Sequence, residues 1–86
     1  MSLKDLTPLA NLTNLTSLDL SHCDISDITP LAGLTKLTSL SLNSNKVSDL
    51  TPLSGVKGIE YLDLRNNPVA DWSPVGHLGD VDGRPR

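Results

Sequence analysis

Apolar and polar positions along this chain follow a pattern that repeats every 22 residues. In the middle period, residues 37–42 alternate between apolar and small polar side chains over their second half, which is typical of a strand with one buried face. Residues 43–45 (Asn, Ser, Asn) then favour a turn, and Val47 returns to an apolar position. The pattern therefore predicts a short strand and a turn in each period.

The second part of each period carries a hydroxyl residue followed by proline. In the middle period, Thr51 is expected to cap free N–H groups while Pro52 fills the first helical position. Gly55 follows closely, so one turn of 3₁₀ or α-helix is expected rather than a long helix. The prolines keep the same spacing throughout, at Pro8, Pro30, Pro52 and Pro74.

This strict spacing predicts a solenoid, in which each coil buries its apolar side against its neighbours. Strands from successive coils are expected to align as a parallel sheet, with neighbours about 4.8 Å apart. Seven columns are apolar in every complete period, for example Leu18, Leu40 and Leu62. The predicted fold is a strand-and-turn solenoid, α/β by class.

Residues 15–25, 37–47 and 59–69 each match the leucine-rich repeat pattern L-x-x-L-x-L-x-x-N/C-x-L, with Ile or Val at some leucine positions. With the 22-residue period and the Asp-Ile/Leu-Thr-Pro-Leu segment, they resemble the internalin-like bacterial repeats over residues 3–81. The resemblance implies a parallel sheet on the concave face, short turns on the convex side, and protein binding. It also implies an extracellular or cell-surface bacterial protein. The N-terminal helical cap and C-terminal cap domain of internalins have no recognisable counterpart here.

Length and charge narrow the organisation and the partners. We expect one repeat domain over residues 1–81, with three full coils and a partial fourth, and a loosely attached tail over residues 82–86. The net charge is −3 and the basic residues are scattered, unlike the clustered positive surface that nucleic acids require. No apolar run is long enough to span a bilayer. We therefore expect a protein partner, without nucleic-acid binding or direct membrane insertion.

Residues that recur in every period are interpreted as scaffold, because a specific site needs to occur only once. One such column could be a carboxylate ladder for calcium, or it could accept backbone N–H groups before the Thr-Pro step. Its recurrence favours the second interpretation. The column consists of Asp5, Asp27, Asp49 and Asp71.

A second scaffold column contains Asn45 and Asn67, which the resemblance implies to be an inward ladder bonding backbone groups in the turns. Cys23 takes the equivalent place and is expected to be buried as a weak donor, with a reactive thiol as the alternative. His22 and Cys23 point to opposite faces if the segment is extended, which argues against a shared catalytic or metal site. No metal and no cofactor are expected.

The columns that vary lie on the outward face of the strands and supply the candidate binding residues. In the third coil, Tyr61 and Arg65 are residue types enriched at interface hot spots. The alternative is that both are ordinary solvated residues, with Arg65 paired to Asp63. The candidate partner-binding set is Tyr61, Asp63, Arg65, Glu60, Asp19, Ser41 and Asn43.

Catalysis is the weakest of the functional hypotheses. Asp19 and Asp63 share a column two coils apart, with backbones about 9.6 Å from each other, which does not exclude glycosidase-like chemistry. A shallow hydrophilic face, however, lacks the concave apolar pocket of a small-molecule site. We expect no enzymatic activity and no catalytic residues.

Three non-catalytic hypotheses remain. The first is a protein-interaction module that uses the strand face. The second is a segment of a longer repeat array that self-associates, as a homodimer, through uncapped ends, since open strand edges invite pairing. The third is carbohydrate binding, for which Tyr61 is the only aromatic platform on that face.

Overall fold

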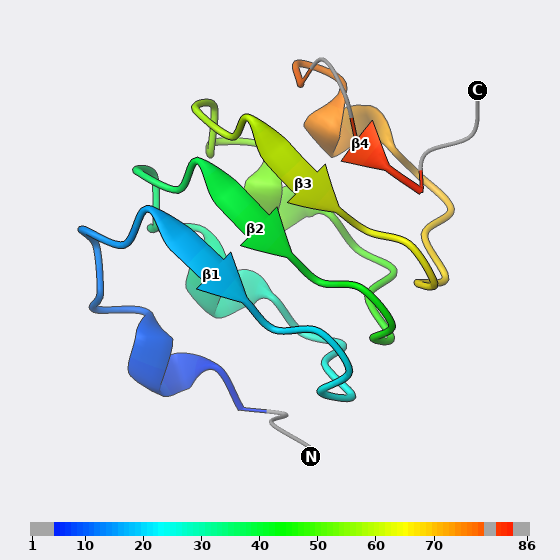
Figure 1. The fold of residues 1–86 in the computed structure, drawn as a ribbon, viewed down its shortest axis with the longest axis horizontal. Helices are drawn as coiled ribbons and strands as arrows, with labels where there is room; N and C mark the ends of the chain where they lie inside the picture. Colours follow the sequence, from blue (N-terminus) through cyan, green and yellow to red (C-terminus); the bar gives the residue numbers. More distant parts are fainter. Residues whose placement is uncertain (1–4, 79–80, 84–86) are drawn as a thin grey trace.

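The computed structural model describes residues 5–78 and 81–83. Strands β1 (Ser17–Asp19), β2 (Ser39–Ser41), β3 (Tyr61–Asp63) and β4 (Val81–Asp82) form one parallel sheet in that order. One 3₁₀ turn precedes each strand in the chain: η1 (Thr7–Leu9), η2 (Thr29–Leu31), η3 (Thr51–Leu53) and η4 (Ser73–Val75). The sheet forms one layer and the 3₁₀ turns form a second layer behind it (Figure 1). The predicted solenoid, including its one-turn 3₁₀ elements, is confirmed.

Strand register follows the repeat until the last coil. Leu18 pairs with Leu40, and Leu40 pairs with Leu62, each 22 residues apart. Leu62 then pairs with Val81, only 19 residues later, and Asp63 pairs with Asp82. The last coil is therefore three residues shorter than the others. As a result Asp82, expected in the tail, belongs to β4, while residues 84–86 of that tail lie outside the described residues.

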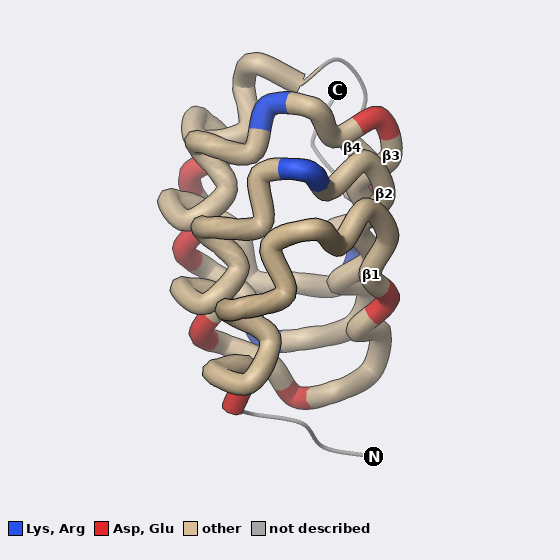
Figure 2. The backbone as a smooth tube through the Cα atoms, turned by 90° about the vertical axis from the view of Figure 1, so that its left-hand side faces the viewer, with Lys and Arg blue, Asp and Glu red and all other residues tan. Residues whose placement is uncertain are grey.

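The start of each 3₁₀ turn is held by aspartate rather than by the threonine hydroxyl. No turn has a side-chain cap hydrogen bond at its N-cap, so the predicted hydroxyl cap is wrong. Instead, the aspartate two residues before each Thr or Ser accepts that residue's N–H at 2.9–3.0 Å. The interpretation of the aspartate column as backbone acceptors is confirmed. Figure 2 shows acidic positions stacked along the side of the coils opposite the strands.

The asparagine ladder joins one coil to the next. Asn45 is 7% exposed, and its Oδ1 accepts the N–H groups of Cys23 and Ile25 at 2.9 and 3.0 Å. Its Nδ2 donates to the carbonyls of Leu20 and Leu42 at 2.9 Å. Asn45 thus satisfies four backbone groups that would otherwise be buried without partners.

Asn67 and Cys23 occupy the same column as Asn45, but they make different hydrogen bonds from each other. Asn67 repeats the ladder toward the coil before it, accepting from Val47 and donating to Leu42. Cys23 is half-buried rather than buried as expected, and its Sγ donates to the Ser21 carbonyl at 3.2 Å. Cys23 follows β1, and among residues 5–78 and 81–83 no strand lies on the outer side of β1 with a turn for Cys23 to bond.

Candidate partner-binding face

The candidate face is the outward side of the four strands, called here the strand face. Because side chains alternate along a strand, Leu18, Leu40 and Leu62 point into the core and their neighbours point outward. The outward residues of the strands are Ser17, Asp19, Ser39, Ser41, Tyr61, Asp63 and Asp82, and the next outward positions are Ser21, Asn43 and Arg65. Among the described residues, no helix or strand covers this face (Figure 1).

Asp63 is the buried centre of a polar cluster on β3. It is 2% exposed, and Arg65 donates to it twice, from Nε to Oδ1 at 3.0 Å and from Nη2 to Oδ2 at 2.9 Å. The Arg65 backbone N–H and the Asn43 amide add bonds of 3.1 and 3.2 Å. The Arg65 hydrogen bonds are the main reason why the pKa of Asp63 falls to about 2. The pairing of Arg65 with Asp63, one of the two alternatives from the sequence, is present.

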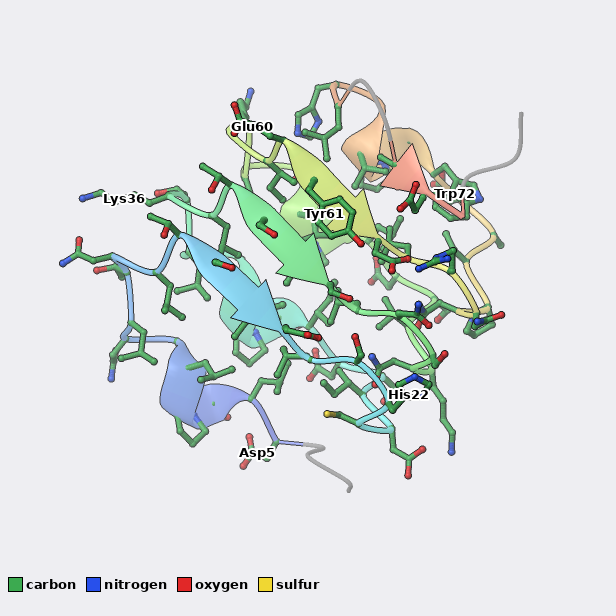
Figure 3. The ribbon with its side chains drawn as sticks, viewed as in Figure 1. Asp5, His22, Lys36, Glu60, Tyr61 and Trp72 are labelled. Atoms are coloured by element: carbon green, nitrogen blue, oxygen red, sulfur yellow. The ribbon has the colours of Figure 1, made fainter. Side chains whose placement is uncertain are left out.

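Tyr61 and Arg65 are the exposed members of this cluster. Tyr61 is 45% exposed and lies over β3 on the strand face (Figure 3), with its hydroxyl 3.4 Å from Asp63 Oδ2. Burial, then the negative charges of Asp63 and Asp82, raises the pKa of Tyr61. The Arg65 side chain is 56% exposed despite its ion pair. Glu60 is exposed at the beginning of β3, at the rim of the face.

The first two coils present a flatter and more polar surface. Asp19 is exposed, and its Oδ1 accepts the hydroxyl and the N–H of Ser21 at 2.7 and 3.1 Å. These two bonds lower the pKa of Asp19. The hydroxyls of Ser21 and Ser41 share a hydrogen bond of 2.9 Å across the strands. Ser41 and Asn43 are half-buried, so small polar groups form this part of the face.

Family membership follows from the match to known proteins. Residues 13–55 and residues 35–77 each match the family described as leucine-rich repeats in two copies. The chain belongs to the leucine-rich repeat family.

Two solved structures show which branch of the family this repeat protein resembles. It is similar to an internalin, InlF, from Listeria monocytogenes, with 38% identity and a TM-score of 0.87 over 93% of this chain and 24% of that one. It is also similar to internalin C2 from the same species, with 34% identity and a TM-score of 0.74 over 91% and 46%. The repeat protein thus spans less than half of each internalin chain. No curated protein sequence gives a significant match.

The resemblance stated from the sequence is therefore confirmed: this is an internalin-like leucine-rich repeat protein of the bacterial type. None of the helices in its described part has the length and apolar character needed to cross a membrane. Within residues 5–78 and 81–83, no three His, Cys, Asp or Glu side chains gather in a way that could hold a metal ion.

Two features of the repeat protein near the strand face were missed from the sequence. Asp82 joins the face beside Asp63 because the last coil is shortened. His22, Ser44 and Asn66 form a column with positive φ of 58°, 61° and 63° in the turns after the strands. Asn66 and His22 carry a recognisable signal, since asparagine and histidine are enriched in left-handed backbone, whereas Ser44 carries none. His22 lies in such a turn beyond β1 rather than in an extended segment (Figure 3).

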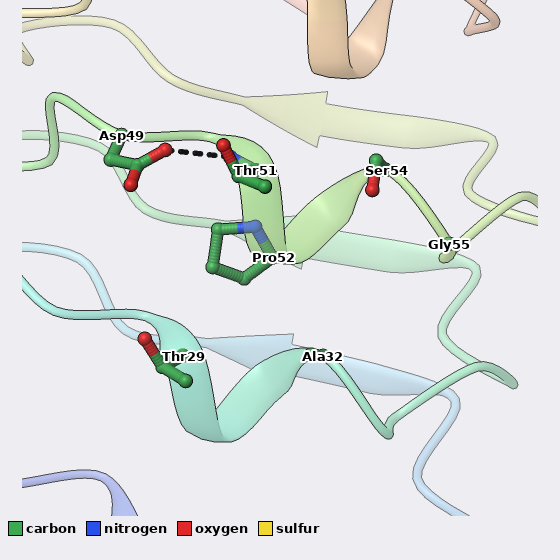
Figure 4. A pocket seen from close by; sticks show the side chains of 7 residues that line it. All are labelled: Thr29, Ala32, Asp49, Thr51, Pro52, Ser54 and Gly55. Carbon is green, nitrogen blue, oxygen red and sulfur yellow. Dashed lines mark hydrogen bonds between the residues drawn. The ribbon is translucent and has the colours of Figure 1, made fainter.

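The 3₁₀ side of the repeat protein contains a shallow hollow of about 500 Å³ between two coils (Figure 4). Its one ionisable side chain is Asp49, whose Oδ1 already accepts the Thr51 N–H at 2.9 Å. The lining residues are Thr29, Ala32, Asp49, Thr51, Pro52, Ser54 and Gly55. The hollow therefore offers no second ionisable group for acid–base chemistry.

Proposed function

We propose that this repeat protein is a non-catalytic interaction module that binds another protein through the strand face. Leucine-rich repeat proteins are in general interaction modules, which supports the class of function. The observation that carries the choice of surface is Tyr61, a large aromatic side chain 45% exposed on an uncovered sheet face. Aromatic and arginine side chains supply much of the binding energy at protein interfaces.

The cluster around Asp63 supports Tyr61 and Arg65 as contact residues. Two parallel bonds from Arg65 to a buried carboxylate fix the guanidinium plane before any partner arrives. Pre-organisation reduces the entropy lost on binding. Asp63 itself is almost inaccessible, so its role in the proposed site is to position Arg65 rather than to touch the partner.

The remaining candidate residues extend this centre over the face. Glu60 would contribute a rim charge, and Asp19, Ser41 and Asn43 would supply hydrogen-bonding groups on the neighbouring coils. By similarity to internalins, we further propose that the module acts outside a bacterial cell or at its surface.

The test measures the affinity of a protein partner, recovered by affinity purification, for two variants. One variant lies on each side of the solenoid. Tyr61→Ala is expected to weaken that partner's binding by about tenfold or more, as at an interface hot spot. Ser54→Ala is the matched control on the 3₁₀ side, opposite the strand face. Ala10 and Ala32 occupy the same column as Ser54, so alanine already stands at this position in two other coils. If Tyr61→Ala and Ser54→Ala bind every partner equally, the strand face is not the binding surface.

A second candidate function is self-association through the β1 end. Leu12 is 47% exposed, whereas Leu34, one coil later in the same column, is fully buried. Three other leucines of the first coil are only half-buried, and no described strand pairs with the outer edge of β1. A second copy stacked on this end would cover these leucines and pair the free edge. The half-buried residues are Leu9, Leu15 and Leu18.

Light scattering behind size exclusion, over a wide range of protein concentration, tests self-association. A mass that rises with concentration and returns to the monomer value in Leu12→Ser would support stacking at this end. Leu6 is unsuitable for this test because it is buried in the core. A monomer at all concentrations, or an assembly unaffected by Leu12→Ser, would reject it.

A further inference from the structure

We infer that the strand face is suited to a protein partner presenting a basic side chain, a lysine or arginine on a loop, that lies between Asp19 and Tyr61. The inference rests on the proposed interaction module and specifies the chemistry of its partner. It follows from the shape of the face, its uncompensated charge and the groups left free on it.

The face has a low floor and a raised wall. Register places Ser17 on β1 beside Ser39 on β2, and Ser39 beside Tyr61 on β3. The row below runs from Asp19 through Ser41 to Asp63. Small hydroxyls thus line β1 and β2, and the aromatic ring rises at β3. Two strand spacings, about 9.6 Å, separate β1 from β3, which leaves room for one extended side chain over the serines.

The charge of this face is negative once its internal ion pair is counted. Arg65 is the one Lys or Arg side chain among the described residues of the face, and Asp63 neutralises it. Asp19, Asp82 and Glu60 have no ion-pair partner among the described residues. The described lysines belong to loops outside the face, as Lys36 shows (Figure 3). A cationic group would gain from this field, whereas a carboxylate would be repelled.

The free groups on the face match a basic side chain in detail. Both hydrogen bonds to Asp19 use Oδ1, which leaves Oδ2 open to a donor from outside. Serine hydroxyls can accept hydrogen bonds, and an exposed aromatic ring attracts a cation over its face. One lysine or arginine could therefore contact Asp19, the serines and Tyr61 together.

The aspartate column on the 3₁₀ side provides an internal comparison. It carries four carboxylates whose Oδ1 atoms accept backbone N–H groups, as the Oδ1 of Asp19 does, but the hollow beside it contains no aromatic residue. If negative charge alone attracted a basic side chain, this column would bind it at least as well as the strand face. Selective binding on the strand face requires Tyr61 and the serine floor in addition to charge.

The experiment is an NMR titration of the amide signals with two blocked tripeptides, acetyl-Gly-Lys-Gly-amide and acetyl-Gly-Glu-Gly-amide. It is run above the ordinary titration range of histidine, because His22 lies close enough to influence Asp19. The lysine peptide is expected to shift the amides of Ser17, Ser39 and Tyr61, and the glutamate peptide is not. Equal responses to both peptides, or shifts confined to the aspartate column, would overturn the inference.

Two charge-matched variants sharpen the titration. Asp19→Asn is expected to weaken lysine-peptide binding by about two- to fivefold, the size of an exposed ion pair. Asp27→Asn removes the same charge from the 3₁₀ side, and its amide oxygen can still accept the Thr29 N–H, so no change is expected. If both variants weaken binding equally, the effect is overall charge and the inference fails.

Tyr61→Ala and Asp19→Asn, tested with a protein partner, separate this inference from the proposed function. A partner that loses affinity in Tyr61→Ala but binds Asp19→Asn as well as the unchanged protein would retain the module and overturn the basic preference. A partner that loses affinity in both would support both. If no partner loses affinity in Tyr61→Ala, the interaction module itself fails, and the inference that rests on it fails as well.

Discussion

The two ends of the sheet are closed to different extents. At the β1 end, Leu12 is 47% exposed and Leu9 is only half-buried. At the β4 end, the last members of the same two columns are covered, with Leu78 6% exposed and Val75 fully buried. Both end coils have a described neighbour on one side only. In these two columns the β4 end is therefore better covered than the β1 end, whereas in the column of Leu6 and Trp72 the buried residue is Leu6 at the β1 end.

The path of the last coil explains its better closure. The step from Leu62 to Val81 is three residues shorter than the repeat, and β4 still pairs with β3 in parallel. Gly83 follows with φ of 98°, and a Cβ there would come within 2.9 Å of the Arg65 nitrogen. This close approach, and the bond from the Leu64 N–H to the Asp82 carbonyl at 2.9 Å, hold the end of the sheet together. The first coil makes the equivalent backbone bond, from the Leu20 N–H to the Ser41 carbonyl at 2.9 Å, so the close approach of Gly83 is what distinguishes the β4 end.

The largest expected difference between an end coil and an inner coil is in the free energy of unfolding that is lost when Leu12 or Leu34, which share a column, is truncated. Leu34→Ala should lower the free energy of unfolding by about 2–5 kcal/mol, because it opens a cavity in a fully buried position. Leu12→Ala should cost less than about 1 kcal/mol, since that side chain is half in water already. Urea denaturation of both variants measures the difference. Similar losses would mean that the β1 end is covered in solution.

A smaller difference is expected in the asparagine ladder. Asn45→Ala should cost about 2–3 kcal/mol because it leaves backbone groups of Cys23, Ile25, Leu20 and Leu42 without their partner. Cys23→Ala removes one weak bond within its own coil and should cost less than about 1 kcal/mol. Thermal unfolding followed by circular dichroism compares them. If Cys23→Ala costs as much as Asn45→Ala, Cys23 contributes more than the one bond within its own coil.

The closure of the β4 end can be broken at Gly83. Gly83→Ala should destabilise the protein by about 1–3 kcal/mol, because alanine is strained at this φ and its Cβ meets the Arg65 backbone. Hydrogen exchange of the Leu64 amide should become faster in this variant, since β4 loosens. Gly33→Ala is the control, because nothing lies within 4 Å of the added Cβ. Unchanged exchange at Leu64 would show that Gly83 does not close this end.

The smallest expected effect concerns Asp19 and Asp63, which occupy one column in the first and third coils. Asp63 has a folded-state pKa of about 2, below the ordinary 3.8, so its contribution is present above pH 3.8 and is lost as the pH falls toward 2. Asp63→Asn should remove at most about 2 kcal/mol from the acid dependence of stability. Asp19→Asn should leave most of that dependence in place, because Asp19 is exposed. Unfolding free energies measured across this pH range compare the two, and identical acid limbs would rule out a special role for Asp63.

The repeat itself made most of the fold predictable. The strands, the 3₁₀ turns and the inward Asn45 all follow from one spacing that never changes between Pro8 and Pro74. The fourth strand was not predicted, because counting by 22 puts Val81 under Ile59, while the shortened coil pairs it with Leu62. The turn start was wrong because Asp and Thr side chains can both accept N–H groups, and the sequence does not show which oxygen reaches the turn.

The candidate site was predictable in its orientation and less so in its accessibility. Register alone predicts that Tyr61 points outward, as the structure has it, while its binding role stays a prediction. The burial of Asp63 depends on Asn43 from the preceding coil and on the conformation of Arg65. Such convergence between coils has no signature in a single stretch of sequence. Asp63 therefore changes from an expected contact residue to one that positions Arg65.

The regular spacing of the bonds between coils has an evolutionary consequence. Asn14 accepts from Lys36, and Asn45 accepts from Cys23, each across 22 residues, while Asn45 also bonds Ile25 and Leu20 across 20 and 25 residues, so these bonds all join adjacent coils. Unequal recombination between the coding segments of two such coils would add or remove one whole period and keep every column aligned. The area of the strand face can therefore change by one coil at a time without a new packing problem to solve.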